Sequence, residues 1–184
     1  CTAVSSNNIQ GMEDLVKYIY GQGHRKIAYI HGQQASYVTK DRLASFYRTV
    51  DELGLKIPDE YIRTADYLET REAAKQTKEL LNLEDPPTCI IYPDDTSLIG
   101  GRNVIIEMGL RIPRDISVVG YDGNLISQIM SPQLTTYRQD TEALGRAAAE
   151  LLIEQIESPR TALPEQKLIS GSLLKGQSVD VPNP

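Results

Sequence analysis

Polar side chains follow several apolar runs of this sequence, where they could bind a polar ligand. They include carboxylates, a guanidinium and phenols: Arg42, Asp66, Tyr67, Asp94, Asp95, Tyr121 and Asp122. Carboxylates and a guanidinium can hold neighbouring hydroxyl groups through charge-assisted hydrogen bonds, and a tyrosine ring can cover the apolar face of a sugar ring. This set of side chains therefore favours a polyhydroxylated ligand.

Structural roles compete with ligand binding at most of these positions. Either Asp94 or Asp95 could be only the N-cap of the helix that follows. Asp122 could be an ordinary turn residue, Arg42 could face solvent from a helix, and Tyr67 could pack at the end of a strand. The residue types and their spacing leave these alternatives open.

Motifs for catalysis and for metal binding are missing from the sequence. It contains no Gly-x-Ser-x-Gly, Gly-x4-Gly-Lys-Ser/Thr, Gly-x-Gly-x2-Gly or His-Glu-x2-His. The two histidines and two cysteines are not spaced as ligands, so we expect neither a metal nor another cofactor. Several carboxylates in one crevice could serve glycoside hydrolysis, but no motif predicts turnover. We expect a binding protein rather than an enzyme.

Helical and strand-like periods alternate along the first two thirds of the chain. Apolar residues at helical spacing predict helices over 12–19, 43–50, 70–81 and 96–107, and short apolar runs predict strands over 27–30, 61–65, 89–91 and 116–119. Thr70 is a candidate N-cap. This alternation is typical of an α/β fold with an open parallel sheet and helices on both faces. In such sheets the carboxyl ends of the strands form the crevice that receives a ligand.

The regular alternation of helical and strand-like patterns ends after Gly120. We expect a short apolar turn at 125–130, an extended segment at 134–137, a long helix over Thr141–Glu157 and a last strand at 167–170. One stripe of the long helix is apolar, and Pro159 and Pro164 follow it.

Length and composition limit the number of domains and the kinds of partner that we expect. A length of 184 residues suits one compact domain, with or without an appendage, and 19 basic against 25 acidic residues leave a net charge of −6. Lys and Arg form no cluster, so this part of the protein is not expected to bind nucleic acid. No apolar run is long enough to span a membrane. We interpret Cys89 as a small buried side chain, and Cys1-Thr2-Ala3-Val4 as a strand already under way.

Three strings resemble one known family. Residues 23–30 (GHRKIAYI), 113–122 (PRDISVVGYD) and 131–140 (SPQLTTYRQD) are similar to motifs of LacI/GalR-type transcriptional regulators, in the same order. The similarity covers nearly the whole chain. It implies the effector-binding core of such a regulator, with a periplasmic-binding-protein-like type I lobe.

The resemblance assigns roles to individual residues. It implies effector contacts by Arg42, Tyr67, Asp94, Asp122 and Gln139, the last of them near the crossover to another lobe, and supporting roles for Asp66, Asp95 and Tyr121. Ser45 departs from the family, which usually has glycine there. Asp94 is more acidic than the usual residue, so we expect a cationic or donor-rich effector.

The resemblance also divides the chain. Residues 1–140 would be the second lobe, 141–166 a return helix that belongs to a first lobe, and 167–184 closing strands of the second lobe. The first lobe and a helix-turn-helix head would then be absent from this chain. We expect the apolar stripe of the return helix to dock on a neighbouring chain or on its own lobe.

The implied function is ligand sensing in a cytoplasmic repressor. A small-molecule effector, most simply a carbohydrate, would shift the population of lobe arrangements in a homodimer, and the absent head would bind operator DNA. Leu98, Arg102 and Ile105 are the candidate dimer contacts. No membrane partner is expected. The alternative is a periplasmic sugar-binding receptor of a transporter, which would carry a signal peptide instead of a DNA-binding head.

Overall fold

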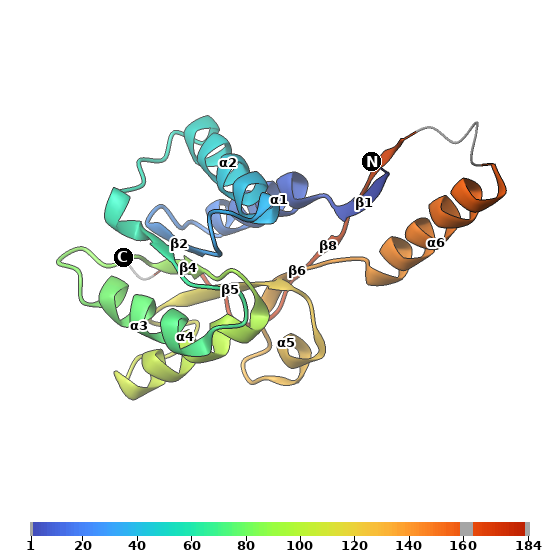
Figure 1. Ribbon diagram of the computed structural model, residues 1–184. Coiled ribbons are helices and arrows are strands. Elements are labelled where there is room, and N and C mark those ends of the chain that lie inside the picture. The colour runs from blue at the N-terminus through green and yellow to red at the C-terminus, as the bar shows by residue number, and fades with distance from the viewer. Residues whose placement is uncertain (1, 159–163, 183–184) are drawn as a thin grey trace.

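The computed structural model describes residues 2–158 and 164–182, and its main body is a six-stranded sheet (Figure 1). The strands lie in the order β3-β2-β4-β5-β6-β8, and each pair is parallel except β6 and β8. Their bounds are β2 (Ile27–His31), β3 (Ile62–Thr64), β4 (Cys89–Ile91), β5 (Ser117–Asp122), β6 (Thr135–Arg138) and β8 (Ser172–Leu174). The expected α/β class with a mainly parallel sheet is confirmed.

Helices cover both faces of this sheet, as expected (Figure 1). They are α1 (Asn8–Gly21) and α2 (Tyr37–Glu52) on one face, and α3 (Thr70–Leu81) and α4 (Asp95–Glu107) on the other. Alternate strand residues divide the core between the faces, because successive side chains of a strand point to opposite sides. Ile27 and Tyr29 pack with α1 and α2, whereas Ala28 and Ile30 pack with α3 and α4.

Capping side chains start several helices where the sequence changes from a turn to a helical period. Asn7 accepts a hydrogen bond from the Gln10 N–H at the start of α1, and Asp94 accepts one from the Ser97 N–H at the start of α4. The expectation that Thr70 is an N-cap is wrong. Glu69 occupies the cap position without a side-chain hydrogen bond there, and Thr70 is the first helical residue.

Two elements near the ends of the chain form a separate small sheet. The strands β1 (Ala3–Ser6) and β7 (Gln166–Ile169) pair in parallel, and α6 (Thr141–Glu157) packs on them, apart from the main body (Figure 1). The predicted segment 1–140 therefore contains one strand that lies outside the main sheet. The predicted closing segment 167–184 is divided as well, since only β8 joins that sheet.

The long helix α6 has the expected bounds, but other parts of the chain bury little of its surface. Ala147 is its one buried residue, while Leu152, Ile153 and Ile156 are exposed. Of the two expected arrangements, docking on its own lobe is seen only in part, because α6 packs on β1 and β7 of the small sheet. The other arrangement, docking on a neighbouring chain, stays a prediction.

Smaller differences concern short elements. Residues 59–61 form a 3-10 helix (η1, Asp59–Tyr61) before β3, where the sequence predicted a strand from Tyr61. The apolar turn after β5 contains a short helix, α5 (Leu125–Ile129). The strand β8 lies within the closing strands that the resemblance implied over 167–184, but the local pattern did not predict it, because three residues between two glycine-containing turns are too few to show a period.

Two findings concern the described residues alone. None of their helices is both long and apolar enough to cross a membrane. Within the same ranges, no group of three or more His, Cys, Asp or Glu side chains is arranged to hold a metal ion. Cys89 is buried with a free thiol, and Cys1 and Pro159 lie outside the described residues.

Candidate functional site

A cavity of about 410 Å³ lies at the carboxyl ends of the parallel strands, beside the small sheet. All five residues for which we expected effector contact line it. The complete lining is Ser5, Ser6, Asn8, Ser36, Val38, Arg42, Tyr67, Leu68, Asp94, Asp122 and Gln139. The strands bring these residues together because their carboxyl ends meet at one edge of the sheet.

Arg42 reaches the cavity from α2 with its guanidinium held on several sides. The Nε–H donates to Asn8 Oδ1 and Nη1 donates to the Pro93 carbonyl, both at 2.9 Å. The guanidinium carbon lies 3.4 Å from the centroid of the Tyr121 ring. Since an arginine has five N–H donors, these two bonds leave donors for a ligand.

Tyr121 supports this arginine from inside the core. It is fully buried and does not line the cavity. Its ring stacks beneath the Arg42 guanidinium, so it can support the cavity only through that arginine. A desolvated cation–π contact of this kind stabilises by about 2 kcal/mol. Burial raises the pKa of the Tyr121 hydroxyl, and the charge of Arg42 opposes that shift.

Asp122 ends β5 and contributes a carboxylate to the cavity. Its Oδ1 accepts a hydrogen bond of 2.6 Å from Gln139 Nε2, which leaves Oδ2 for other donors. Burial raises the pKa of Asp122, and the positive charge of Arg42 lowers it. The backbone φ of Asp122 is +106°, a strained value for a residue with a Cβ. Because strained residues cluster at ligand sites, this conformation makes the Asp122 carboxylate a candidate ligand contact.

Tyr67 forms a fixed aromatic wall. Its hydroxyl lies 2.9 Å from Thr39 Oγ1, and its ring covers the backbone of Gly32. A Cβ at position 32 would lie 2.3 Å from a carbon of this ring, so only glycine permits that contact. The ring is partly exposed and lies beside Arg42, with 5.9 Å between the ring centroid and the guanidinium carbon.

The two adjacent aspartates at the start of α4 differ. Asp94 lines the cavity and is also the N-cap of α4, the alternative that the sequence left open. Asp95 turns into the interior, where its Oδ2 accepts a hydrogen bond of 2.9 Å from the Asn124 N–H. Burial raises the pKa of Asp95 to about 6, and the Asn124 bond opposes this shift. Its supporting role is therefore to hold the turn after Asp122.

Asp66 does not belong to this site. It is exposed and lines a different surface hollow together with Glu69 and Glu72. The expectation that it supports the ligand cavity is wrong, because Asp66 is not among the residues that line that cavity.

Six residues of the lining were not predicted: Ser5, Ser6, Asn8, Ser36, Val38 and Leu68. Asn8 is the most informative of them, since it is buried and accepts the Arg42 Nε–H. In the sequence, Asn7 and Asn8 precede the helix predicted over 12–19. Nothing in the local pattern shows that the start of this helix lies against Arg42, which is more than thirty residues away in the sequence.

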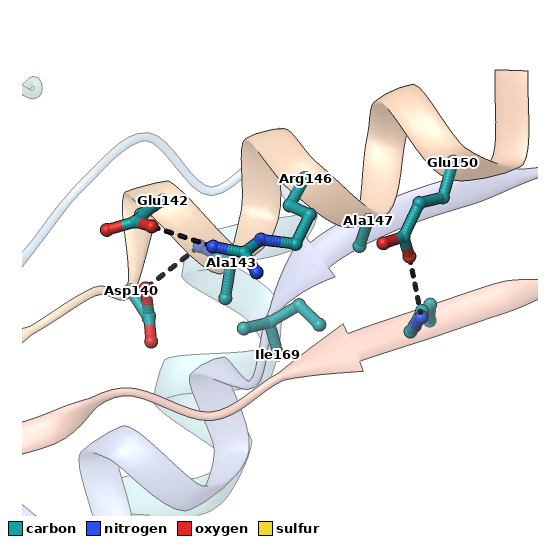
Figure 2. Close-up of a pocket in the computed structure, with 8 residues that line it drawn as sticks. Asp140, Glu142, Ala143, Arg146, Ala147, Glu150 and Ile169 are labelled. Carbon is teal, nitrogen blue, oxygen red and sulfur yellow. Dashed lines mark hydrogen bonds and ion pairs between the residues drawn. The ribbon is translucent and has the colours of Figure 1, made fainter. Parts of the chain in front are cut away.

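A second hollow lies between α6 and β7 (Figure 2). Its charged side chains pair with one another: Arg146 donates to Glu142 at 2.8 Å, and Lys167 lies 4.0 Å from Glu150. These side chains are largely solvent-exposed, and exposed pairs of this kind stabilise little. We regard the cavity around Arg42 and Asp122 as the candidate site, because its polar groups are buried and convergent.

The predicted dimer contacts need correction. Leu98 and Ile105 are fully buried within the core between α3, α4 and the sheet, so neither offers surface to a partner. Arg102 is half-buried and donates to the Ser131 carbonyl at 3.1 Å. The helix α5, which contacts α4, carries the exposed apolar residues Leu125 and Ile129, each 70 % exposed.

A family model and curated relatives both match most of this chain. Residues 16–179 match the model of the family described as "Periplasmic binding protein-like domain". The chain is 33 % identical over 154 residues to the HTH-type transcriptional repressor PurR of Aliivibrio salmonicida, which covers 84 % of this chain and 46 % of that protein. The chain thus spans about half the length of the curated relatives that it matches.

Two solved structures are similar over almost the whole chain. A putative LacI transcriptional regulator from Bacillus cereus superposes with a TM-score of 0.92 at 30 % identity, covering 99 % of this chain and 64 % of that one. A complex of the transcriptional regulator CelR with cellobiose superposes with a TM-score of 0.89 at 25 % identity, covering 96 % and 54 %.

Proposed function

This chain belongs to the periplasmic binding protein-like domain family, in the form found in LacI-family transcriptional regulators, and we propose that it is the effector-sensing part of such a repressor. The observation that carries the proposal is the cavity in which Arg42, Asp122 and Tyr67 converge. The chain does not act as an enzyme in this proposal. The named relatives favour a cytoplasmic repressor over the alternative of a periplasmic transport receptor.

The chemistry of the cavity fits a carbohydrate. The free donors of Arg42 and the free oxygen of Asp122 can hold neighbouring hydroxyl groups, while Tyr67 offers a ring face to a sugar ring. The bound cellobiose of CelR supports the same class. The charge of Arg42 offsets that of Asp122, and the second carboxylate of the lining, Asp94, already accepts hydrogen bonds from Ser97 and Leu68. A neutral, donor-rich effector therefore fits better than a cationic one.

The small sheet and α6 belong, in this proposal, to a first lobe of a longer protein. Ser5 and Ser6, the last two residues of β1, already line the cavity. A first lobe would close over the same cavity and supply the remaining contacts. Its closure would depend on the effector, which binds one lobe arrangement better than the other and so shifts their populations.

The proposed partners are a second copy of the chain and operator DNA. The net charge of −6 and the lack of a basic cluster assign DNA contact to another part of the longer protein. For the homodimer we propose the apolar surface formed by Leu125 and Ile129, with Arg102 beside it, in place of Leu98 and Ile105.

Thermal-shift screening of the full-length protein tests the proposal. The panel contains neutral mono- and disaccharides, amino sugars, nucleosides and purines. Asp122→Asn keeps the shape of the side chain but removes its charge, and Arg42→Ala removes the donors. We expect a neutral sugar to raise Tm, with its Kd weakened roughly ten- to a hundredfold in each variant, because each loses a charged hydrogen bond.

Asp41→Asn is the matched control, since Asp41 is exposed on the same helix and does not line the cavity. It should leave the Kd unchanged. Stabilisation that survives both cavity variants would mean that the site is elsewhere. A purine or nucleoside hit that is lost in both variants would keep the site and overturn the carbohydrate class.

A further inference from the structure

The carboxylate of Asp94 is occupied by hydrogen bonds from the protein itself. Its Oδ1 accepts from the Ser97 N–H at 2.7 Å, and its Oδ2 accepts from the Ser97 hydroxyl and from the Leu68 N–H, both at 2.9 Å. The residue is only 1 % exposed. A carboxylate has about four acceptor positions, so little of Asp94 is left for a ligand although it lines the cavity.

Leu68, which donates one of these bonds, has an unfavourable backbone conformation. Its φ is +65°, in the left-handed region, which costs a residue with a Cβ about 1–2 kcal/mol. Its side chain is exposed and gains little from packing. Within the described ranges, the other non-glycine residue with positive φ is Asp122, and it lines the same cavity.

The strained residue directly follows Tyr67, the aromatic wall of the cavity. The direction of the chain at Leu68 determines where the Tyr67 ring lies, and the ring must lie flat enough to cover Gly32 and to reach Thr39. The hydrogen bond from Leu68 to Asp94 is the described contact that ties this turn to the rigid start of α4.

We propose that Asp94 is a positioning residue, which holds Leu68 in its left-handed conformation and thereby fixes the Tyr67 ring, instead of binding the effector directly. The relevance of this role to ligand recognition rests on the proposed function. The acidity of position 94 then reflects three protein donors and the N-terminus of a helix, where a negative charge is favourable. It does not require a cationic effector.

Two variants separate this role from helix capping. Asp94→Asn keeps one acceptor oxygen, which can still cap α4 through the Ser97 N–H, but it replaces the other oxygen with an NH₂ group that cannot accept from Leu68. Ser97→Ala is the matched control, because it removes a donor to the same carboxylate and leaves the Leu68 bond in place.

Amide hydrogen exchange by NMR on the 184-residue chain reads out the bond without any effector. In Asp94→Asn we expect the Leu68 amide to exchange at least about tenfold faster, with the amides of α4 unchanged. The nuclear Overhauser contacts between the Tyr67 ring and the Gly32 α-protons should weaken. In Ser97→Ala both observables should stay close to those of the unaltered chain.

A rescue variant makes the test specific. Glycine adopts positive φ without a steric cost, so Leu68→Gly in the Asp94→Asn background should restore the contacts between Tyr67 and Gly32. The proposal is overturned if Asp94→Asn leaves Leu68 exchange and the Tyr67 contacts unchanged, or if Ser97→Ala alters them equally. Both observables are independent of effector identity, so they can succeed where the proposed function fails, and the reverse.

Discussion

At the residue scale, the neighbouring residues Asp94 and Asp95 direct their carboxylates to different places. The cap conformation of Asp94 leaves its carboxylate at the cavity, whereas Asp95 begins the helix and turns inward to the Asn124 N–H. Asp122 and Asn124 flank Gly123 in the turn that Asp95 holds. The interior carboxylate therefore supports the site without contacting its cavity.

The buried carboxylate of Asp95 should make stability depend on pH. Its pKa in the folded chain is about 6, above its ordinary value of 3.8, because burial disfavours the charged form. Between these pH values the folded state binds more protons than the unfolded state, so stability falls as pH rises. The penalty is complete above pH 6 and amounts to at most about 3 kcal/mol.

Asp95→Asn removes this titration. We expect the variant to gain stability relative to the unaltered chain as pH rises from 4 to 7, measured by urea unfolding at each pH. Asp115→Asn is a control without a comparable trend over this range, because the bond from Arg111 lowers the pKa of that carboxyl below its ordinary value of 3.8 and its titration falls at lower pH. A difference between Asp95→Asn and the unaltered chain that is constant over this range would contradict the burial argument.

At the element scale, close contact between α3 and α4 depends on a residue without a side chain. A Cβ on Gly100 would lie 1.9 Å from the Thr70 carbonyl oxygen of α3. The backbone fixes the position of a Cβ, and its partner is a backbone oxygen, so no rotamer change can relieve the clash. Gly145, in the middle of α6, has no heavy atom within 4 Å of the corresponding position. The same residue type is thus required in one helix and dispensable in another.

Gly100→Ala and Gly145→Ala should therefore change stability in opposite directions. We expect Gly100→Ala to cost about 1–3 kcal/mol through overpacking, and Gly145→Ala to gain up to about 1 kcal/mol from better helix propensity. Thermal unfolding measures the first, and amide exchange within α6 measures the second. Equal effects of the two substitutions would show that helix propensity, and not the approach of α3, dominates at position 100.

At the scale of the whole molecule, two apolar surfaces lie at different places. One is formed by Leu125 and Ile129 on α5 of the main body, and the other by Leu152 and Ile156 on α6 (Figure 1). The first is the proposed dimer surface. The second is the surface that a first lobe would cover in the proposed longer protein.

Analytical ultracentrifugation and thermal unfolding distinguish these surfaces. In a longer protein that includes the other half present in the relatives, Leu125→Glu with Ile129→Glu should weaken the dimer with little change in Tm. Leu152→Glu with Ile156→Glu should lower Tm, because charged groups would be buried without partners. In the 184-residue chain the α6 variant should reduce self-association. A dimer that persists in the α5 variant would exclude the proposed interface.

The sequence by itself determined the class of the fold and most of the candidate site. Alternating helical and strand periods predict the parallel sheet, because burial on one face of a helix or on both faces of a strand is visible in local spacing. Arg42, Tyr67, Asp94, Asp122 and Gln139 line one cavity as predicted, since strand ends of a parallel sheet meet at one edge.

The tertiary structure alone decided which distant groups meet. Asn8 on Arg42, Tyr121 beneath it, and Leu68 on Asp94 are contacts between segments that local spacing does not relate. The same holds for the pairing of β1 with β7 and for the complete burial of Leu98 and Ile105. A periodic pattern shows that a side chain is buried, but the packing of the whole chain determines against which neighbour it is buried.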